Sequence, residues 1–218
     1  MTFGRVIARS CAILTLMAAA LASAQPAPVT PASFDALLAA FARMPGLEAR
    51  FVEEKRLGLL AKPLESRGRL FFAKPSYLLR KVEAPTPSEV RITADSLRVK
   101  NADGEQTLDL RSRPDLRPFV ESLTWLLSGN RKALANVYGI AFEPGAVGAW
   151  RVTLTPKGEP ISKLIQHIRI AGRGLAVSQI EVRETSGDET VTRIVEANPE
   201  RRFDAAELRR LFGTSPAR

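Results

Sequence analysis

The chain has 218 residues and a formal net charge of +9, and it contains 45% hydrophobic residues, 6% aromatic residues, one histidine and one cysteine. This inventory excludes metal sites built from several histidines or cysteines, while the length suffices for one domain with a sizeable core. The basic excess indicates attraction to anionic surfaces such as lipid head groups, or simply charge that maintains solubility.

The N-terminal segment has the layout of a secretory signal peptide. Two arginines precede an uncharged apolar run over 11–21, and Ala22-Ser23-Ala24 then supplies the small residues of a cleavage site. The run is about half as long as a membrane-spanning helix requires. We therefore expect cleavage after residues 1–24 and a periplasmic mature protein that begins at Gln25. An uncleaved anchor helix is the alternative.

Cleavage would change the chemistry of the chain. It would remove Cys11, the single cysteine, so the mature chain would have neither a disulfide nor a thiolate. It would also remove two arginines and no acid, which lowers the net charge from +9 to +7. Export argues against nucleic acid as a partner. We expect a flexible mature N-terminus over 25–30, a single domain over 31–211 and a tail over 212–218.

The first half of the domain predicts one helix and then strands. Phe34, Leu37 and Phe41 recur at helical spacing, and Pro45-Gly46 ends the run. Short apolar or alternating segments follow, separated by turn residues. Because strands succeed one another with no helix between them, they predict an antiparallel sheet. The expected strands cover 47–56, 68–73, 77–82, 90–94, 97–100 and 107–110.

The middle of the chain interrupts this series with helices. Residues 117–129 carry Phe119, Leu123 and Leu126 at helical spacing, with Trp125 off that stripe, so this helix needs cover on more than one face. A second short helix is expected over 130–136. Further strands are expected over 150–155, 164–170, 177–184 and 190–197, and a capping-box pattern predicts a last helix over 204–211.

This order of elements resembles the periplasmic outer-membrane lipoprotein carriers of the LolA family, as a divergent member. Three short motifs carry the resemblance: Leu47-Glu48-Ala49-Arg50-Phe51 after the first helix, Gly68-Arg69-Leu70-Phe71-Phe72-Ala73-Lys74-Pro75, and Leu154-Thr155-Pro156-Lys157 after the helical middle. The resemblance implies a mainly β (α+β) fold, an unclosed antiparallel β-barrel covered by a helical lid. It also implies an apolar cavity that receives acyl chains.

The resemblance and the alternation of the strands together nominate site residues. The helix that contains Phe119, Leu123, Trp125 and Leu126 is the expected lid. Lys74 stands where the family has an arginine that latches the lid to the barrel, and a lysine offers a single donor point instead of a planar fork. A solvated strand-end charge is the other interpretation of Lys74. The expected cavity lining is Phe51, Leu70, Phe72, Leu79, Ile92, Val99, Ile168 and Ile170, although sequence does not determine which alternate set faces inward.

The residues give no support to an enzyme. His167 is the single histidine, no G-x-S-x-G elbow is present, and Glu53 and Glu54, as strand neighbours, point to opposite faces. We therefore expect no catalytic residue, no metal and no cofactor.

Two functions remain open. The first is a carrier that moves an acylated lipoprotein or another lipid towards the outer membrane. The second is a lipid-binding sensor, or an accessory module of a lipid exporter. The expected partners are the lipid itself, an inner-membrane exporter, an outer-membrane acceptor and a transient membrane surface. The protein is expected to be a monomer.

Overall fold

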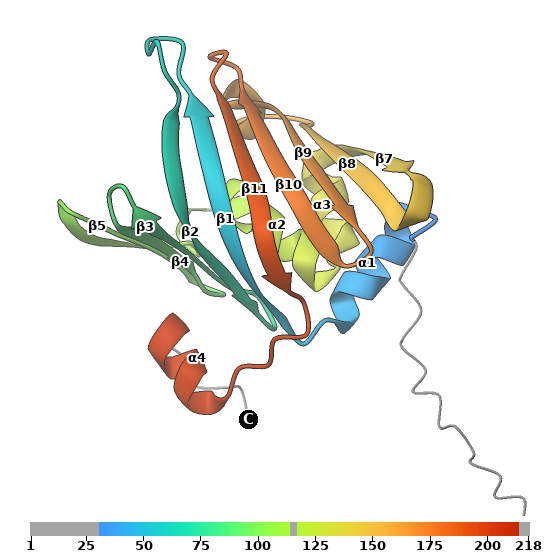
Figure 1. Ribbon diagram of the computed structural model, residues 1–218, viewed down its shortest axis with the longest axis horizontal. Helices are drawn as coiled ribbons and strands as arrows, with labels where there is room; N and C mark the ends of the chain where they lie inside the picture. The colour runs from blue at the N-terminus through green and yellow to red at the C-terminus, as the bar shows by residue number, and fades with distance from the viewer. Residues whose placement is uncertain (1–30, 114–116, 214–218) are drawn as a thin grey trace, which may run out of the picture.

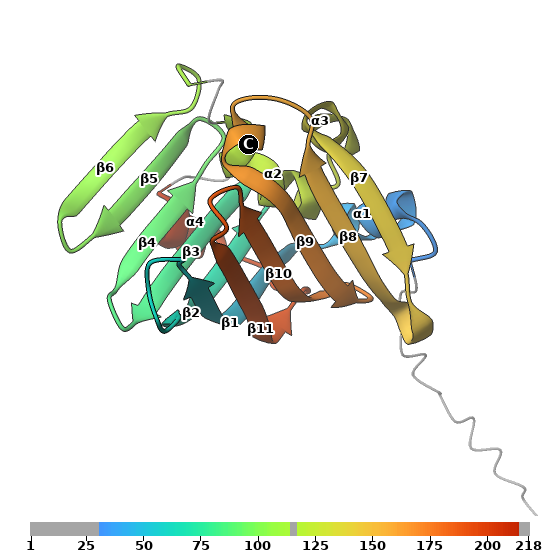
Figure 2. The same cartoon turned by 90° about the horizontal axis from the view of Figure 1, so that it is seen from above.

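An eleven-stranded antiparallel sheet forms the frame of the molecule in the computed structural model, which describes residues 31–113 and 117–213. The strand order is β6-β5-β4-β3-β2-β1-β11-β10-β9-β8-β7. Figure 2 shows the sheet bending around helices, with β6 and β7 at its two edges. The strands are β1 (Gly46–Arg56), β2 (Leu64–Ala73), β3 (Tyr77–Ala84), β4 (Ser88–Ile92), β5 (Ser96–Asn101), β6 (Gly104–Asp109), β7 (Tyr138–Pro144), β8 (Ala149–Pro156), β9 (Ile165–Arg173), β10 (Ala176–Glu184) and β11 (Glu189–Asn198).

The expected fold class, an unclosed antiparallel half-barrel with helices, is confirmed. Strands adjacent in sequence pair with each other, except that β6 and β7 form the two edges, and β1 also pairs with β11 at the centre. Gly68 of β2 permits a close approach to β3, since a Cβ atom at this position would lie 2.0 Å from the carbonyl oxygen of Lys81. The expected signal peptide and the N-terminal part over 25–30 lie outside the described residues.

Three helices lie against the concave face of the sheet: α1 (Phe34–Arg43), α2 (Arg117–Ser128) and α3 (Arg131–Val137). Ser33 caps α1 by accepting the backbone N–H of Ala36 at 3.2 Å, and Asn130 caps α3 in the same way. Short 3₁₀ turns, η1 (Ala146–Gly148) and η2 (Ile161–Lys163), precede β8 and β9. Between sheet and helices lies the main core, in which Phe41, Phe72 and Leu126 are fully buried.

A fourth helix, α4 (Ala205–Phe212), lies on the opposite, convex face (Figure 1). Asp204 and Glu207 form the predicted capping box at its start. Its last residue, Phe212, is 2% exposed and stacks on Tyr77 with ring centroids 5.7 Å apart. The helix thus extends to Phe212, one residue past its expected end at 211. Phe71, Ala73 and Leu79 complete this second apolar cluster.

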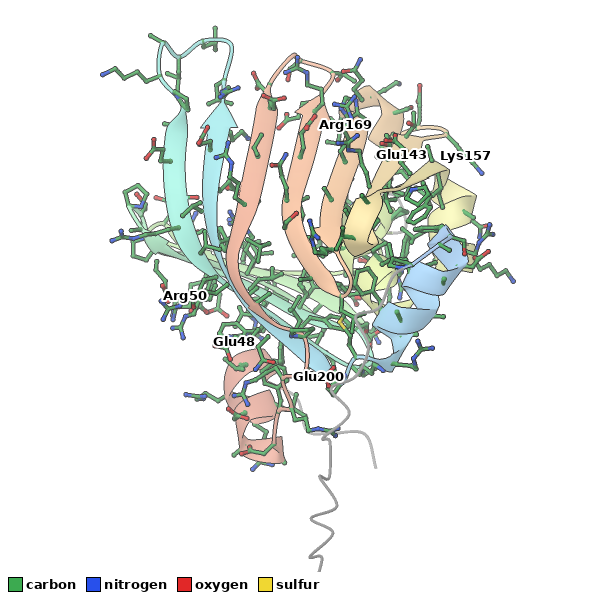
Figure 3. All side chains as sticks on the ribbon, turned by 45° about the vertical axis from the view of Figure 1, so that its right-hand side comes forward. Glu48, Arg50, Glu143, Lys157, Arg169 and Glu200 are labelled. Carbon is green, nitrogen blue, oxygen red and sulfur yellow. The ribbon has the colours of Figure 1, made fainter. Side chains whose placement is uncertain are left out.

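The remaining convex face is charged. Arg50, Glu143 and Arg169 project from it (Figure 3), and each has an ion-pair partner on a neighbouring strand, as in the 2.9 Å contact between Arg169 and Glu181. The two faces therefore differ in character: the concave face holds the core and the convex face, apart from the α4 contact, meets solvent.

One strand, β7, is absent from the sequence prediction, which placed no element between the second middle helix and residue 150. Tyr138, Ile140 and Phe142 of this strand pack on the main core. Gly139 and Ala141 alternate with them and weaken the contrast between apolar and polar positions that predicts a strand. The other expected elements are present with bounds shifted by one to four residues at most ends.

Candidate functional site: an apolar cavity beneath α2

A cavity of about 360 Å³ lies between the concave face of the sheet and α2. Its volume falls within the range of roughly 300–1,000 Å³ that is typical of ligand pockets. The walls are mostly aliphatic, and the residues that line them come from seven strands and one helix. The lining residues are Phe51, Leu70, Arg80, Val120, Ser122, Leu123, Leu154, Ile168, Ile170, Ile180, Val182, Thr192 and Ile194.

The helix α2 forms one wall because its apolar residues spread over two faces. Val120 and Leu123 line the cavity, whereas Leu126 and Leu127, one turn later, are buried in the core beside α1. Trp125 is partly buried and also packs on the core. An apolar surface on two faces requires contacts on both, and the sheet and the neighbouring helices supply them.

The buried polar groups of α2 have partners. Ser122 is 6% exposed, and its hydroxyl lies 2.6 Å from that of Tyr138. Burial raises the pKa of the Tyr138 phenol, while the hydrogen bond to Ser122 opposes that rise. Thr124 donates to the backbone carbonyl of Glu121 at 2.7 Å, and Glu121 pairs with Arg117 at 2.9 Å. The Ser122–Tyr138 bond joins α2 to β7, whereas the other two bonds lie within the helix and give the buried carboxylate of Glu121 a cationic partner.

One margin of the cavity is polar. The guanidinium of Arg80 lies over the ring of Phe51, 4.8 Å from its centroid, and donates to Glu53 at 2.6 Å. Thr192 donates to the other carboxylate oxygen of Glu53 at 2.7 Å. The cavity is therefore amphipathic, because an apolar interior ends at a paired cation and anion. Such a site suits a ligand with an apolar chain and a polar end.

The described residues provide no cluster of metal-ligating side chains at the site. No group of three or more histidine, cysteine, aspartate or glutamate side chains could hold a metal ion in residues 31–113 and 117–213. His167 lies on the charged convex face, where it approaches Glu181 at 3.4 Å. In the same two ranges, no helix is long and apolar enough to cross a membrane.

A family model described as outer membrane lipoprotein carrier protein LolA-like matches residues 26–211. The chain belongs to the LolA-like family. Among curated proteins, no sequence matches it.

Solved structures similar to this LolA-like protein share little sequence with it. A LolA superfamily protein from Nitrosomonas europaea has a TM-score of 0.42 at 10% identity, over 79% of this chain and 94% of that chain. The MucA/MucB complex of Pseudomonas aeruginosa contains a chain with a TM-score of 0.48 at 13% identity, over 80% of this chain and 60% of that chain. A putative outer membrane lipoprotein-sorting protein domain from Vibrio parahaemolyticus has a TM-score of 0.40 at 10% identity, over 71% and 85%.

The structure brings four of the nominated strand residues together around the cavity of the LolA-like fold: Phe51, Leu70, Ile168 and Ile170. Phe72 and Ile92 lie on the same face but in the packed core beyond it. Val99 is partly buried opposite Val90, also outside the cavity.

Leu79 was expected in the cavity lining, but it lies on the opposite face of the sheet. It pairs with Phe71 and lies beneath α4 on the convex side, because its neighbour Leu78 occupies the inward position. Leu78 and Leu79 are both apolar because both faces of the sheet are covered here. Alternation of apolar and polar residues therefore could not indicate which of the two leucines faces inward.

The nominated lid residues have different surroundings. Leu123 lines the cavity, Leu126 is buried in the core and Trp125 is partly buried beside it. The side chain of Phe119 lies outside the described part of α2.

Lys74, the nominated latch, donates a hydrogen bond to the backbone carbonyl of Ala42. This contact reaches α1 rather than α2. It joins the turn after β2 to the last turn of α1, which in turn packs on α2.

Several lining residues were not nominated from the sequence, chiefly Leu154, Ile180, Val182 and Ile194. In β10 the alternation is interrupted by an irregularity between Val177 and Gln179, so Val177 and Ile180 face the same side despite their odd spacing. Downstream of it, Ile180 and Val182 alternate regularly with charged residues. That local alternation was the signal that could have identified them.

Proposed function

We propose that this protein binds acyl chains of a lipoprotein or another lipid in the cavity beneath α2 and carries them through the periplasm towards the outer membrane. The supporting observation is the cavity itself, with its aliphatic walls and a polar margin at Arg80 and Glu53. Membership of the LolA-like family supports the same class of ligand and a periplasmic location.

The energetics favour such a ligand. Each methylene group transferred from water into an apolar site contributes about 0.8 kcal/mol. Even a partly enclosed chain thus has a substantial gross driving force, before the cost of ordering it. The polar margin would lie next to the head group or the acylated residue, where Arg80 offers its remaining N–H donors to ester or phosphate oxygens.

The direct experiment is extraction of the purified protein with organic solvent, followed by mass spectrometry of the extract. A defined acyl lipid, recovered at a constant ratio to protein and displaced by a fluorescent fatty acid, is the expected result. A cavity that is consistently empty, with no fatty-acid binding, would contradict the proposal. An empty cavity together with a tightly bound protein partner would instead favour a sensor.

The transfer step needs its own measurement. Protein loaded with radiolabelled lipid is incubated with inner-membrane or outer-membrane vesicles, and the label is followed after separation. Preferential release to outer-membrane vesicles is expected of a carrier. Retention of the label with both kinds of vesicle would contradict carriage and leave binding alone.

A further inference from the structure

Exposed leucines gather at one end of the half-barrel. In the loop between β1 and β2, Leu59 is 99% exposed and Leu60 is 46% exposed, and Leu64 at the start of β2 is 51% exposed. Leu164, just before β9, is 55% exposed. Isolated surface leucines are ordinary, but a group of them at a protruding tip indicates a surface that meets an apolar partner. Figure 1 shows the β1–β2 tip projecting beyond the helices.

Hydrogen bonds hold this end together. The backbone N–H of Leu60 donates to the carbonyl of Leu57 at 3.0 Å, which closes a turn with Leu59 at its outer corner. The N–H of Gly58 donates to Asp188 in the β10–β11 turn at 2.9 Å. That turn is itself bonded to the segment before β9, because Thr185 donates to the carbonyl of Leu164 at 3.0 Å. The leucines are therefore presented by one connected surface.

Charges of both signs lie beside the tip, including the carboxylates of Glu65 and Asp188. Lys55 and Arg56 pair with Glu184 and Glu189 at 3.5 and 3.4 Å. Lys62 in the loop and Arg67 on β2, by contrast, are exposed and have no ion-pair partner among the described residues. Apolar side chains at a convex tip, flanked by unpaired cations, match the two layers of a bilayer surface, namely acyl chains below anionic phosphates.

We infer that this end of the half-barrel docks on a bilayer that contains anionic phospholipid, with Leu59 and Leu60 inserted among the lipids and Lys62 and Arg67 against the phosphates. A convex tip does not require a complementary groove in a lipid surface, whereas it would in a folded protein. The docking surface is distinct from the cavity, and vesicle binding can be measured without transfer, so this inference and the proposed carrier function can fail separately.

Docking in this way would bring the polar margin of the cavity towards the membrane. Along β1, Phe51 of the cavity wall is followed by Glu53 and Lys55 and then by the tip, so this margin lies between the cavity and the docking surface. Along β11, Thr192 likewise lies nearer the tip than Ile194 does. A lipid that left the bilayer at the tip would meet these polar groups first.

The test is vesicle flotation of the purified protein, whose N-terminus is determined first. One set of vesicles contains phosphatidylethanolamine and the anionic lipid phosphatidylglycerol, and the other contains phosphatidylcholine alone. We expect binding to the anionic vesicles that weakens with salt. Leu59→Asp should reduce it by about tenfold or more, because one leucine leaves the lipid and a like charge meets the phosphates. Lys62→Glu should reduce binding and its salt dependence together.

The matched control is Val147→Asp, which introduces the same charge at an 81% exposed apolar residue between β7 and β8, at the opposite ends of the strands. Its vesicle binding should stay within about twofold of the native protein. Equal losses of vesicle binding in Leu59→Asp and Val147→Asp would show that the loss comes from the change in net charge, and would overturn the inference. So would native protein that fails to bind anionic vesicles, or that instead captures a protein through the same tip.

Discussion

The hydroxyl groups of Ser122 and Tyr138 lie 2.6 Å apart and link α2 to the first residue of β7. Tyr138 is 1% exposed, so this bond lies in the core, and it connects one wall of the cavity to an edge strand of the sheet. A hydrogen bond between two buried groups orients both, because each would be costly to leave without a partner. The position of α2 over the cavity therefore depends on β7.

Tyr138→Phe should lower the free energy of unfolding by about 1 kcal/mol, since it removes one hydrogen bond while keeping the ring. It should also change the dependence of stability on pH. Burial raises the pKa of Tyr138 in the folded state, so its contribution is complete below about pH 10 and is lost as pH rises through the folded-state pKa.

The measurement is urea unfolding of both proteins at a series of pH values on either side of this range. The native protein should lose stability more steeply at alkaline pH than Tyr138→Phe, because lysines and other groups titrate equally in both. Parallel curves would show that the phenol does not ionise on unfolding in the expected range.

Leu123→Glu should weaken the binding of a fluorescent fatty acid by about tenfold or more, because it places a charge on the cavity wall. The loss of affinity should exceed what the change in melting temperature explains. Leu208→Glu is the matched control, since Leu208 is a partly buried leucine of a helix on the convex face. Unchanged affinity in folded Leu123→Glu would mean that this residue does not face the ligand.

Lys74 offers a test of the latch. Because its ammonium donates to the carbonyl of Ala42, Lys74→Leu should free α1 and accelerate uptake of the fatty acid, by at most about fivefold for one hydrogen bond. Lys74→Arg can donate more bonds and should slow uptake. Stopped-flow fluorescence measures both rates. Identical rates in the two variants and the native protein would reduce Lys74 to a solvated charge at the end of β2.

Export is tested by N-terminal sequencing of the protein from the periplasmic fraction. The pattern that ends at Ala24 predicts a mature chain that begins at Gln25 or within a few residues of it. Replacing Ala22 and Ala24 with bulky residues should leave an uncut precursor, as cleavage requires small side chains there. An intact Met1 in the membrane fraction of the native protein would contradict a cleaved signal.

The unclosed half-barrel was implied by the resemblance to the LolA family. The sequence itself predicted the antiparallel sheet well, because strands follow one another directly and most of them alternate across one solvated and one buried face. It predicted the site less well where that condition fails. Phe71-Phe72 and Leu78-Leu79 are apolar on consecutive positions, since α4 covers the convex face while the core covers the other. Which leucine faces the main core then depends on the packing of a helix more than 120 residues later in the chain.

Local backbone geometry also limits how much of the site the sequence can predict. The irregularity in β10 changes which residues face inward, and no residue type between Val177 and Gln179 indicates it. The contact of Lys74 with α1 depends on how the turn after β2 meets a helix that ends before β1. Periodicity describes single elements, so contacts between elements distant in sequence are the part that it leaves undetermined.

The pairing of β1 with β11 has a consequence for folding. These strands are far apart in the chain, and the contact between Arg193 and Glu54 spans 139 residues. The central ladder of the sheet can form only after nearly all of the polypeptide has become available, and such long-range pairing is slow. Until then β1 exposes a strand edge without its β11 partner. A newly made chain would therefore stay incomplete and prone to association until its last strand arrives.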